Sequence, residues 1–130
     1  MEEAETPVTS GIDAPDVSSA EKRQHPRLPV HWQAALMVQQ RPSMGKLGDL
    51  SRGGLTFLGE YNLAIGTKHQ FYIRMPNADR TSYHQLEVIA QVCACSLMAS
   101  QGLYRVGLRI LEMRGNTAEH LMHYLHVNGG

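Results

Sequence analysis

Hydrophobic and polar residues alternate along most of this chain. A row of apolar residues with polar neighbours between them begins at Leu28 and continues through Val30, Trp32, Ala34, Leu36 and Val38. Similar inward rows are expected at Leu55 and Phe57, at Phe71, Ile73 and Met75, at Leu86, Val88, Ala90, Val92 and Ala94, and at Tyr104, Val106, Leu108 and Ile110. A period of two residues is typical of a strand with one buried face. We also expect a turn at residues 41–45 and then a short strand ending at Asp49, which makes six strands with no helix between them and predicts an antiparallel barrel or sandwich.

The last part of the chain has a different period. Ala118, Leu121, Met122 and Leu125 follow the spacing of an amphipathic helix, and Asn116 with Glu119 has the spacing of a capping box. The helix is expected to cover an open end or face of the barrel. The histidines fall on its other side, where a solvated surface is expected, at positions His120, His123 and His126.

Charge divides the chain into two parts. Residues 1–21 contain six acidic residues and no Lys or Arg, a net charge of −6, whereas the rest contains twelve Lys and Arg and six acidic residues, 12 − 6 = +6. The first part is also poor in large apolar residues. These properties predict a disordered acidic tail over residues 1–20 and a basic folded domain over residues 21–130. A basic surface suits an anionic partner.

Neither a membrane span nor a secretion signal is expected. No run of about 18 apolar residues occurs, and the N-terminus lacks a basic region followed by an apolar stretch. We therefore expect a cytoplasmic protein. The cysteines, Cys93 and Cys95, are expected to share the outward face of their strand with Gln91 and Glu87, too close along the chain for an unstrained disulfide. Without a second cysteine pair we predict no metal site and no cofactor.

Two short motifs carry the candidate chemistry. Arg23 and Arg27 are four residues apart in a stretch that Pro26 and Pro29 keep out of a helix, so both guanidinium groups are free to reach one ligand. In the second motif a carboxylate and a hydroxyl two residues apart lie on one side of extended backbone, followed by glycines that let a ligand approach the main chain; its residues are Asp49, Ser51, Gly53 and Gly54.

These motifs, in this order and with strand patterns after each, resemble the RxxxR and (D/N)xSxxG motifs of the PilZ domain, the bacterial receptor module for cyclic di-GMP. The resemblance covers residues 22 to about 126. The stretch from Tyr104 to Arg109, centred on Gly107, is similar to the last strand common in that family. The resemblance implies a mainly β fold, a six-stranded antiparallel PilZ-type β-barrel with a C-terminal α-helix.

The family also implies roles for individual residues. Arg23 and Arg27 are expected to contact guanine and phosphate, because arginine forks two donors onto guanine O6 and N7 and also pairs with phosphate. Asp49 is expected to accept hydrogen bonds from N1–H and the 2-amino group of the other guanine. Ser51 is expected to add a hydroxyl contact, and Gly54 to keep the backbone clear for a flat base.

Neighbouring positions refine the expected ligand mode. Basic residues at the place of Lys22 accompany binding of a self-stacked pair of ligand molecules in the family, so a pair is expected here. Arg52 is expected to be a solvated loop residue. Many PilZ domains carry a tryptophan in the strand before the last, and the corresponding stretch from Ala90 to Cys95 has none, so one stacking contact is expected to be absent.

The resulting hypothesis is a non-enzymatic bacterial effector that binds cyclic di-GMP, changes conformation and signals to an unknown protein partner, with motility, pilus, exopolysaccharide or virulence as the output. The alternative is a PilZ-like protein-interaction adaptor that binds no nucleotide. A hydrolase built on Ser51, Asp49 and His25 would lack a nucleophile elbow and an oxyanion hole. A barrel that binds a nucleic-acid polymer would need more exposed aromatic residues than one Trp, two Phe and five Tyr supply.

Overall fold

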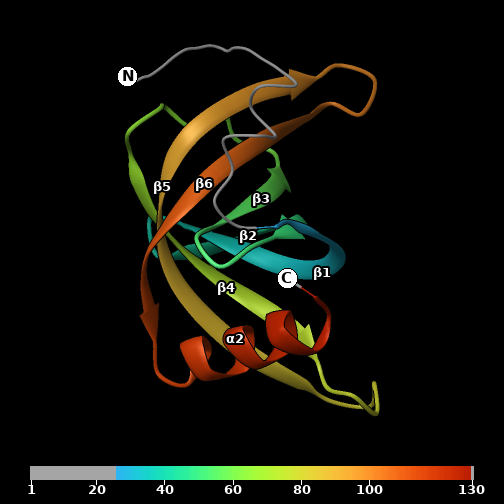
Figure 1. Ribbon diagram of the computed structural model, residues 1–130. Helices are drawn as coiled ribbons and strands as arrows, with labels where there is room; N and C mark the ends of the chain where they lie inside the picture. The colour runs from blue at the N-terminus through green and yellow to red at the C-terminus, as the bar shows by residue number, and fades with distance from the viewer. Residues whose placement is uncertain (1–25, 130) are drawn as a thin grey trace.

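The computed structural model describes residues 26–129. Six strands and a helix follow in the order β1 (Leu28–Val38), β2 (Arg41–Leu50), β3 (Gly54–Gly59), β4 (Lys68–Pro76), β5 (Tyr83–Met98), β6 (Leu103–Arg114) and α2 (Thr117–Val127) (Figure 1). All strand pairs are antiparallel, and the order β1-β2-β3-β6-β5-β4 closes into a barrel. The prediction of a six-stranded antiparallel barrel with a C-terminal helix is confirmed. The predicted tail over residues 1–20 lies outside the described residues.

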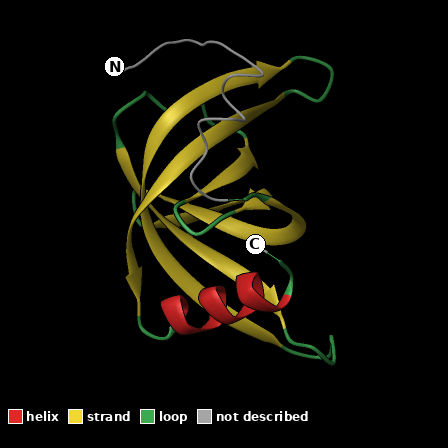
Figure 2. Ribbon diagram, viewed as in Figure 1, coloured by secondary structure: helices red, strands yellow, loops and turns green. Residues whose placement is uncertain are grey.

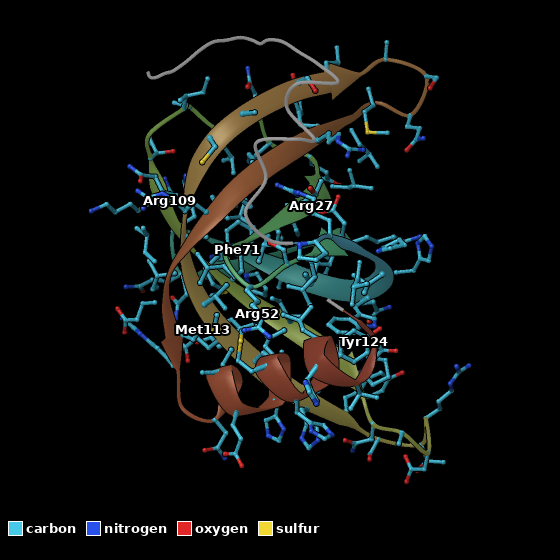
Figure 3. The ribbon with its side chains drawn as sticks, in the orientation of Figure 1. Arg27, Arg52, Phe71, Arg109, Met113 and Tyr124 are labelled. Atoms are coloured by element: carbon cyan, nitrogen blue, oxygen red, sulfur yellow. The ribbon has the colours of Figure 1, made fainter. Side chains whose placement is uncertain are left out.

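The inward rows of the strands meet in one core. Phe57 and Phe71 are its largest fully buried side chains, and their rings pack edge to face with centroids 5.1 Å apart. Figure 3 shows Phe71 inside the barrel. Glycines make room for the Phe57 ring, because a Cβ at Gly45 or Gly59 would lie 2.5 Å or 2.4 Å from its carbon atoms. The alternating pattern therefore predicted most of the buried positions correctly.

The turn between β1 and β2 lies earlier than predicted. Gln39 and Gln40 have positive φ angles of 52° and 68°, which is the backbone of a two-residue hairpin turn with the twist of the flanking strands. Residues 41–45 belong to β2, so the predicted turn there was wrong. Pro42 is tolerated in a strand because this half of β2 pairs with β1 alone, while the pairing of β2 with β3 covers Lys46 to Leu50. Gly45 is needed because a Cβ there would clash with the Leu58 carbonyl oxygen as well as with Phe57.

A bulge in β5 reverses the alternation near its end. The pairing of β5 with β6 shifts register between Val92 and Ala94. Ala94 consequently lies on the exposed outer face, and Cys95 packs partly against the core. The predictions that Ala94 faces inward and that Cys95 faces outward were wrong, because one extra residue in a strand turns every later side chain to the opposite face.

The helix α2 lies across one end of the barrel (Figure 2). Leu121 and Leu125 are fully buried in the core, and the Tyr124 ring meets Trp32 of β1 edge to face at 4.8 Å. The expected covering of the barrel end by an amphipathic helix is confirmed. Thr117, rather than Ala118, takes the first inward position, and its hydroxyl accepts a 2.9 Å hydrogen bond from the Glu87 backbone N–H.

Two details of this helix differ from expectation. The Asn116 side chain makes no capping hydrogen bond, so the predicted capping box does not form. His120 is partly buried and its ring stacks on His84 of β5 at 3.8 Å, because the first turn of the helix faces the start of that strand. His123 and His126 are exposed, as predicted.

Candidate ligand-binding site

Arg27 and Asp49, one from each sequence motif, meet on the outside of the barrel. Arg27 directly precedes β1, Asp49 lies near the end of β2, and the pairing of Leu28 with Leu50 brings the two side chains together. Arg27 Nη1 donates to Asp49 Oδ1 at 2.8 Å and to the Thr56 hydroxyl at 3.3 Å. Arg23 and Lys22, the other basic residues predicted at the site, lie outside the described residues.

A second arginine approaches the same carboxylate. Arg105 of β6 places Nη2 3.8 Å from Asp49 Oδ2, so each oxygen of Asp49 faces one guanidinium group. The exposed fractions are 18% for the Asp49 side chain, 30% for Arg27 and 56% for Arg105. Ion pairs with this much solvent contact stabilise a fold by at most about 1 kcal/mol, so an incoming anion can draw either arginine away at little cost.

Ser51 shapes the turn that joins β2 to β3. Its side chain is buried, with 5% of the residue exposed, and Oγ accepts hydrogen bonds from the backbone N–H groups of Gly53 at 3.3 Å and Gly54 at 3.1 Å. The Ser51 backbone N–H in turn donates to the Gly54 carbonyl at 2.9 Å. The hydroxyl is therefore engaged within the turn, where it holds the main chain next to Asp49 in place.

Gly54 is required by the packing of two strands. A Cβ at this position would lie 2.7 Å from the Leu108 carbonyl oxygen of β6, closer than real contacts allow. This contact explains the glycine without any ligand. Arg52, between Ser51 and Gly54, is exposed as expected, and Figure 3 shows it on the α2 side of Arg27.

A strip of small side chains extends from Asp49 across the outer face. Pairing in register places Asp49 of β2, Thr56 of β3, Gly107 of β6 and Ala94 of β5 side by side. We call Thr56, Gly107 and Ala94 the platform. A Cβ at Gly107 would meet the Ala94 Cβ at 3.7 Å, which is ordinary contact, so the barrel does not need this glycine. A glycine inside a strand weakens the strand and often marks a close approach of a ligand.

Sequence reasoning missed several residues of this site. Thr56 belongs to no motif, Arg105 lies in the Tyr104–Arg109 stretch but has no role assigned to it there, and alternation places Ala94 inside the barrel. Gly107 is the residue whose type signals this part of the site in the sequence, but from the sequence alone it indicates only the family's last strand. The bulge after Val92 turns Ala94 outward, so that it becomes part of the platform. The alternation of residues along one strand contains no information about that register shift.

The arrangement suits a planar ligand that carries negative charge. The guanidinium groups of Arg27 and Arg105 offer forked donors and the carboxylate of Asp49 offers acceptors. The platform offers small side chains, of which Thr56 is buried and hydrogen-bonded to Arg27. Among residues 26–129, no three His, Cys, Asp or Glu side chains are grouped to hold a metal ion. In the same described range no helix combines the length and the apolar character needed to cross a membrane.

By its fold the chain belongs to the class of small antiparallel β-barrel domains. More specifically, this chain belongs to the PilZ family, since the family model described as PilZ domain matches residues 21–126. A comparison with curated protein sequences finds no significant match.

Solved structures of similar fold carry the same barrel. The Bacillus subtilis inhibitor of motility MotI/DgrA superposes with a TM-score of 0.67 at 17% identity, over 83% of this chain and 51% of MotI, so the chain spans about half the length of that protein. The PilZ domain of Escherichia coli YcgR, solved with c-di-GMP, gives 0.59 at 17% identity over 82% of this chain and 90% of that domain. PlzA of Borreliella burgdorferi, in complex with c-di-GMP, gives 0.53 at 9% identity, over 86% of this chain and 54% of PlzA.

Proposed function

We propose that this protein is a cytoplasmic bacterial receptor for cyclic di-GMP that changes conformation on binding and signals to a protein partner. The observation that carries the proposal is the meeting of Arg27, Asp49 and Arg105 beside the platform. Membership of the PilZ family and the c-di-GMP complexes of YcgR and PlzA support it. The proposed outputs are those of the family: motility, pilus function, exopolysaccharide export or virulence.

In the proposed complex the ligand replaces ion pairs within the protein. Asp49 accepts hydrogen bonds from N1–H and the 2-amino group of one guanine. Arg27 leaves Asp49 and forks onto O6 and N7 of a guanine or onto a phosphate, together with Arg23. A base lies flat on Gly107 and its neighbours, while Ser51 holds the turn that positions Asp49. Gly54 lets β3 approach β6 closely beneath this surface.

The same exchange accounts for a conformational signal. Arg27 lies at the junction between the first 25 residues and β1, so movement of its side chain toward the ligand repositions the chain before the barrel. Lys22 and Arg23 then join the phosphates. A self-stacked ligand pair doubles the phosphate charge available to these cations, which is why we propose binding as a pair. The partner reads the surface that results.

Calorimetric titration of the whole chain with cyclic di-GMP, and separately with cyclic di-AMP, tests the proposal. Adenine lacks the O6 acceptor and the N1–H and 2-amino donors that the site is proposed to use. Cyclic di-GMP is therefore expected to bind at least about 100-fold more tightly, because buried polar groups left without partners penalise the wrong base. Two ligands per chain are expected. No heat with cyclic di-GMP would favour the adaptor, and equal binding of both nucleotides would contradict the assigned contacts.

Substitution of Gly107 tests the platform. Gly107→Ala adds a methyl group in ordinary contact with Ala94, and Gly107→Leu adds a side chain that stands over the platform. Cyclic di-GMP affinity is expected to fall in the order Gly, Ala, Leu, by about tenfold or more for Leu, because a bulky side chain excludes a flat base. The midpoint of urea unfolding is expected to stay the same or rise. Unchanged affinity in Gly107→Leu would exclude the platform from the binding site.

A further inference from the structure

A hollow lies on the outer wall of the barrel, over the seam where β1 meets β4. It has a volume of about 420 Å³. The pairing of β1 with β4 is short, from Ala34 to Leu36. Residues of β1, β2, β4 and β5 line the hollow over this seam. The apolar part of the wall comes from Ala35 and Met37 of β1, Pro42 and Met44 of β2 and Tyr72 of β4.

The apolar wall is open to solvent and adaptable. Met44 is 57% exposed, and Met37 lies beside it across the β1–β2 hairpin. Ala35, opposite Met44, forms a low point because its side chain is small. Flexible thioethers adjust to different apolar side chains, and a hollow of this size accommodates one large side chain.

One of the residues that line the hollow, Arg74, is charged. Arg74 of β4 is exposed, its guanidinium lies 5.3 Å from the centre of the Tyr83 ring, and Nη1 lies 3.4 Å from Gln33 Oε1. Lys46 of β2 pairs with Gln33 across the hairpin. None of the residues that line the hollow is acidic, and within the described part of the chain no carboxylate forms an ion pair with Arg74. A guanidinium held by neutral neighbours is prepared for a carboxylate from outside.

We propose that this hollow is the docking site for an acidic segment of a partner protein, which inserts one large apolar side chain beside Met44 and pairs a carboxylate with Arg74. Charge complementarity selects this occupant. In a two-fold symmetric pair, a second copy of the chain would bring Arg74 and Lys46 against their own equivalents and be repelled. Residues 1–21 are acidic as well, so a competing peptide of that sequence distinguishes them from a separate partner.

The hollow and the ligand site occupy opposite ends of one hairpin. Met37 and Pro42 pair near the tip of the β1–β2 hairpin, and Asp49 lies near its base. Because one hairpin joins the two places, cyclic di-GMP bound at its base could change docking near its tip. This control of docking rests on the proposed function. Docking itself does not, because the residues that line the hollow are different from those of the ligand site. The two ideas can therefore fail separately.

Selection of phage-displayed random twelve-residue peptides on the full chain, without nucleotide, tests the docking site. Peptides with Asp or Glu within about one helical turn of Leu, Met or Phe are expected to be enriched. Their affinity, measured by fluorescence polarisation, is expected to fall at least about tenfold in Arg74→Glu and in Met44→Asp. Peptides with Lys in place of the acid should prefer Arg74→Glu to the natural chain.

Arg80→Glu is the matched control, because Arg80 is an exposed arginine in the β4–β5 connection outside the hollow. It is expected to change peptide affinity by less than about twofold. Absence of an acidic consensus, or equal binding to the natural chain and Arg74→Glu, would overturn the proposal. A synthetic peptide of residues 1–21 is added as a competitor. If it displaces the selected peptides with similar affinity, the occupant is the chain's own N-terminal segment and the proposed separate partner is wrong.

Discussion

Replacing Arg27 by alanine is expected to weaken cyclic di-GMP binding about 100-fold. Arg27 is the described arginine that contacts Asp49 most closely, at 2.8 Å, and in the proposed complex it forks onto a guanine or a phosphate. A charge-assisted forked pair contributes roughly 1.5–3 kcal/mol, and each 1.4 kcal/mol corresponds to about tenfold in affinity. Calorimetric titration of the natural and variant chains measures the change. Arg27→Lys keeps the charge but loses the fork, so it is expected to recover only part of the affinity.

Arg41→Ala is the control for this variant. Arg41 is exposed at the other end of the same hairpin, where β2 begins. The Arg41→Ala chain is therefore expected to bind cyclic di-GMP with the affinity of the natural chain. Both variants should unfold within about 1 kcal/mol of the natural protein, because the Arg27 ion pair is partly exposed. An Arg27→Ala chain that binds with natural affinity would remove Arg27 from the site. Equal losses of cyclic di-GMP affinity in both variants would show that Arg27 acts only through general charge attraction and not through a specific contact.

Replacing Phe57 by alanine is expected to lower the free energy of unfolding by about 3–5 kcal/mol. Phe57 is 2% exposed, stacks edge to face on Phe71, and is contacted by the backbone at Gly45 and Gly59. Since the backbone at Gly45 and Gly59 lies close to the ring, the cavity left by its removal cannot easily collapse. Domains of this kind are stable by roughly 5–15 kcal/mol in total, so the loss is large. Urea unfolding at 25 °C followed by circular dichroism measures it.

Tyr61→Ala serves as the comparison for Phe57→Ala. Tyr61 is an aromatic residue shortly after β3, but it is 45% exposed. Its removal is expected to change the free energy of unfolding by no more than about 0.5 kcal/mol. A loss below about 1 kcal/mol in Phe57→Ala, or equal losses in both variants, would show that the barrel interior does not depend on the Phe57 ring.

Much of the barrel was predictable because strand formation leaves a local pattern. Alternation identified the inward rows that contain Trp32, Phe71 and Val88, and the change of period identified the helix that carries Leu121 and Leu125. The predicted site cluster contained Lys22 and Arg23, which lie outside the described residues, and Arg27, Asp49, Ser51 and Gly54. These four residues lie around the β2–β3 turn and the start of β1. Their roles toward cyclic di-GMP are still predictions.

Other features depended on how distant strands pair. The two-residue turn at Gln39 and Gln40, the outward position of Ala94 and the approach of Arg105 to Asp49 all follow from register and from a bulge. The alternation of apolar and polar residues is a local property of the sequence, so the residues of each strand and their inward face could be predicted from the sequence. The register between two strands is set by closure of the whole barrel, in which strands far apart in the chain must align together. The platform and the hollow beside Arg74 are products of that alignment.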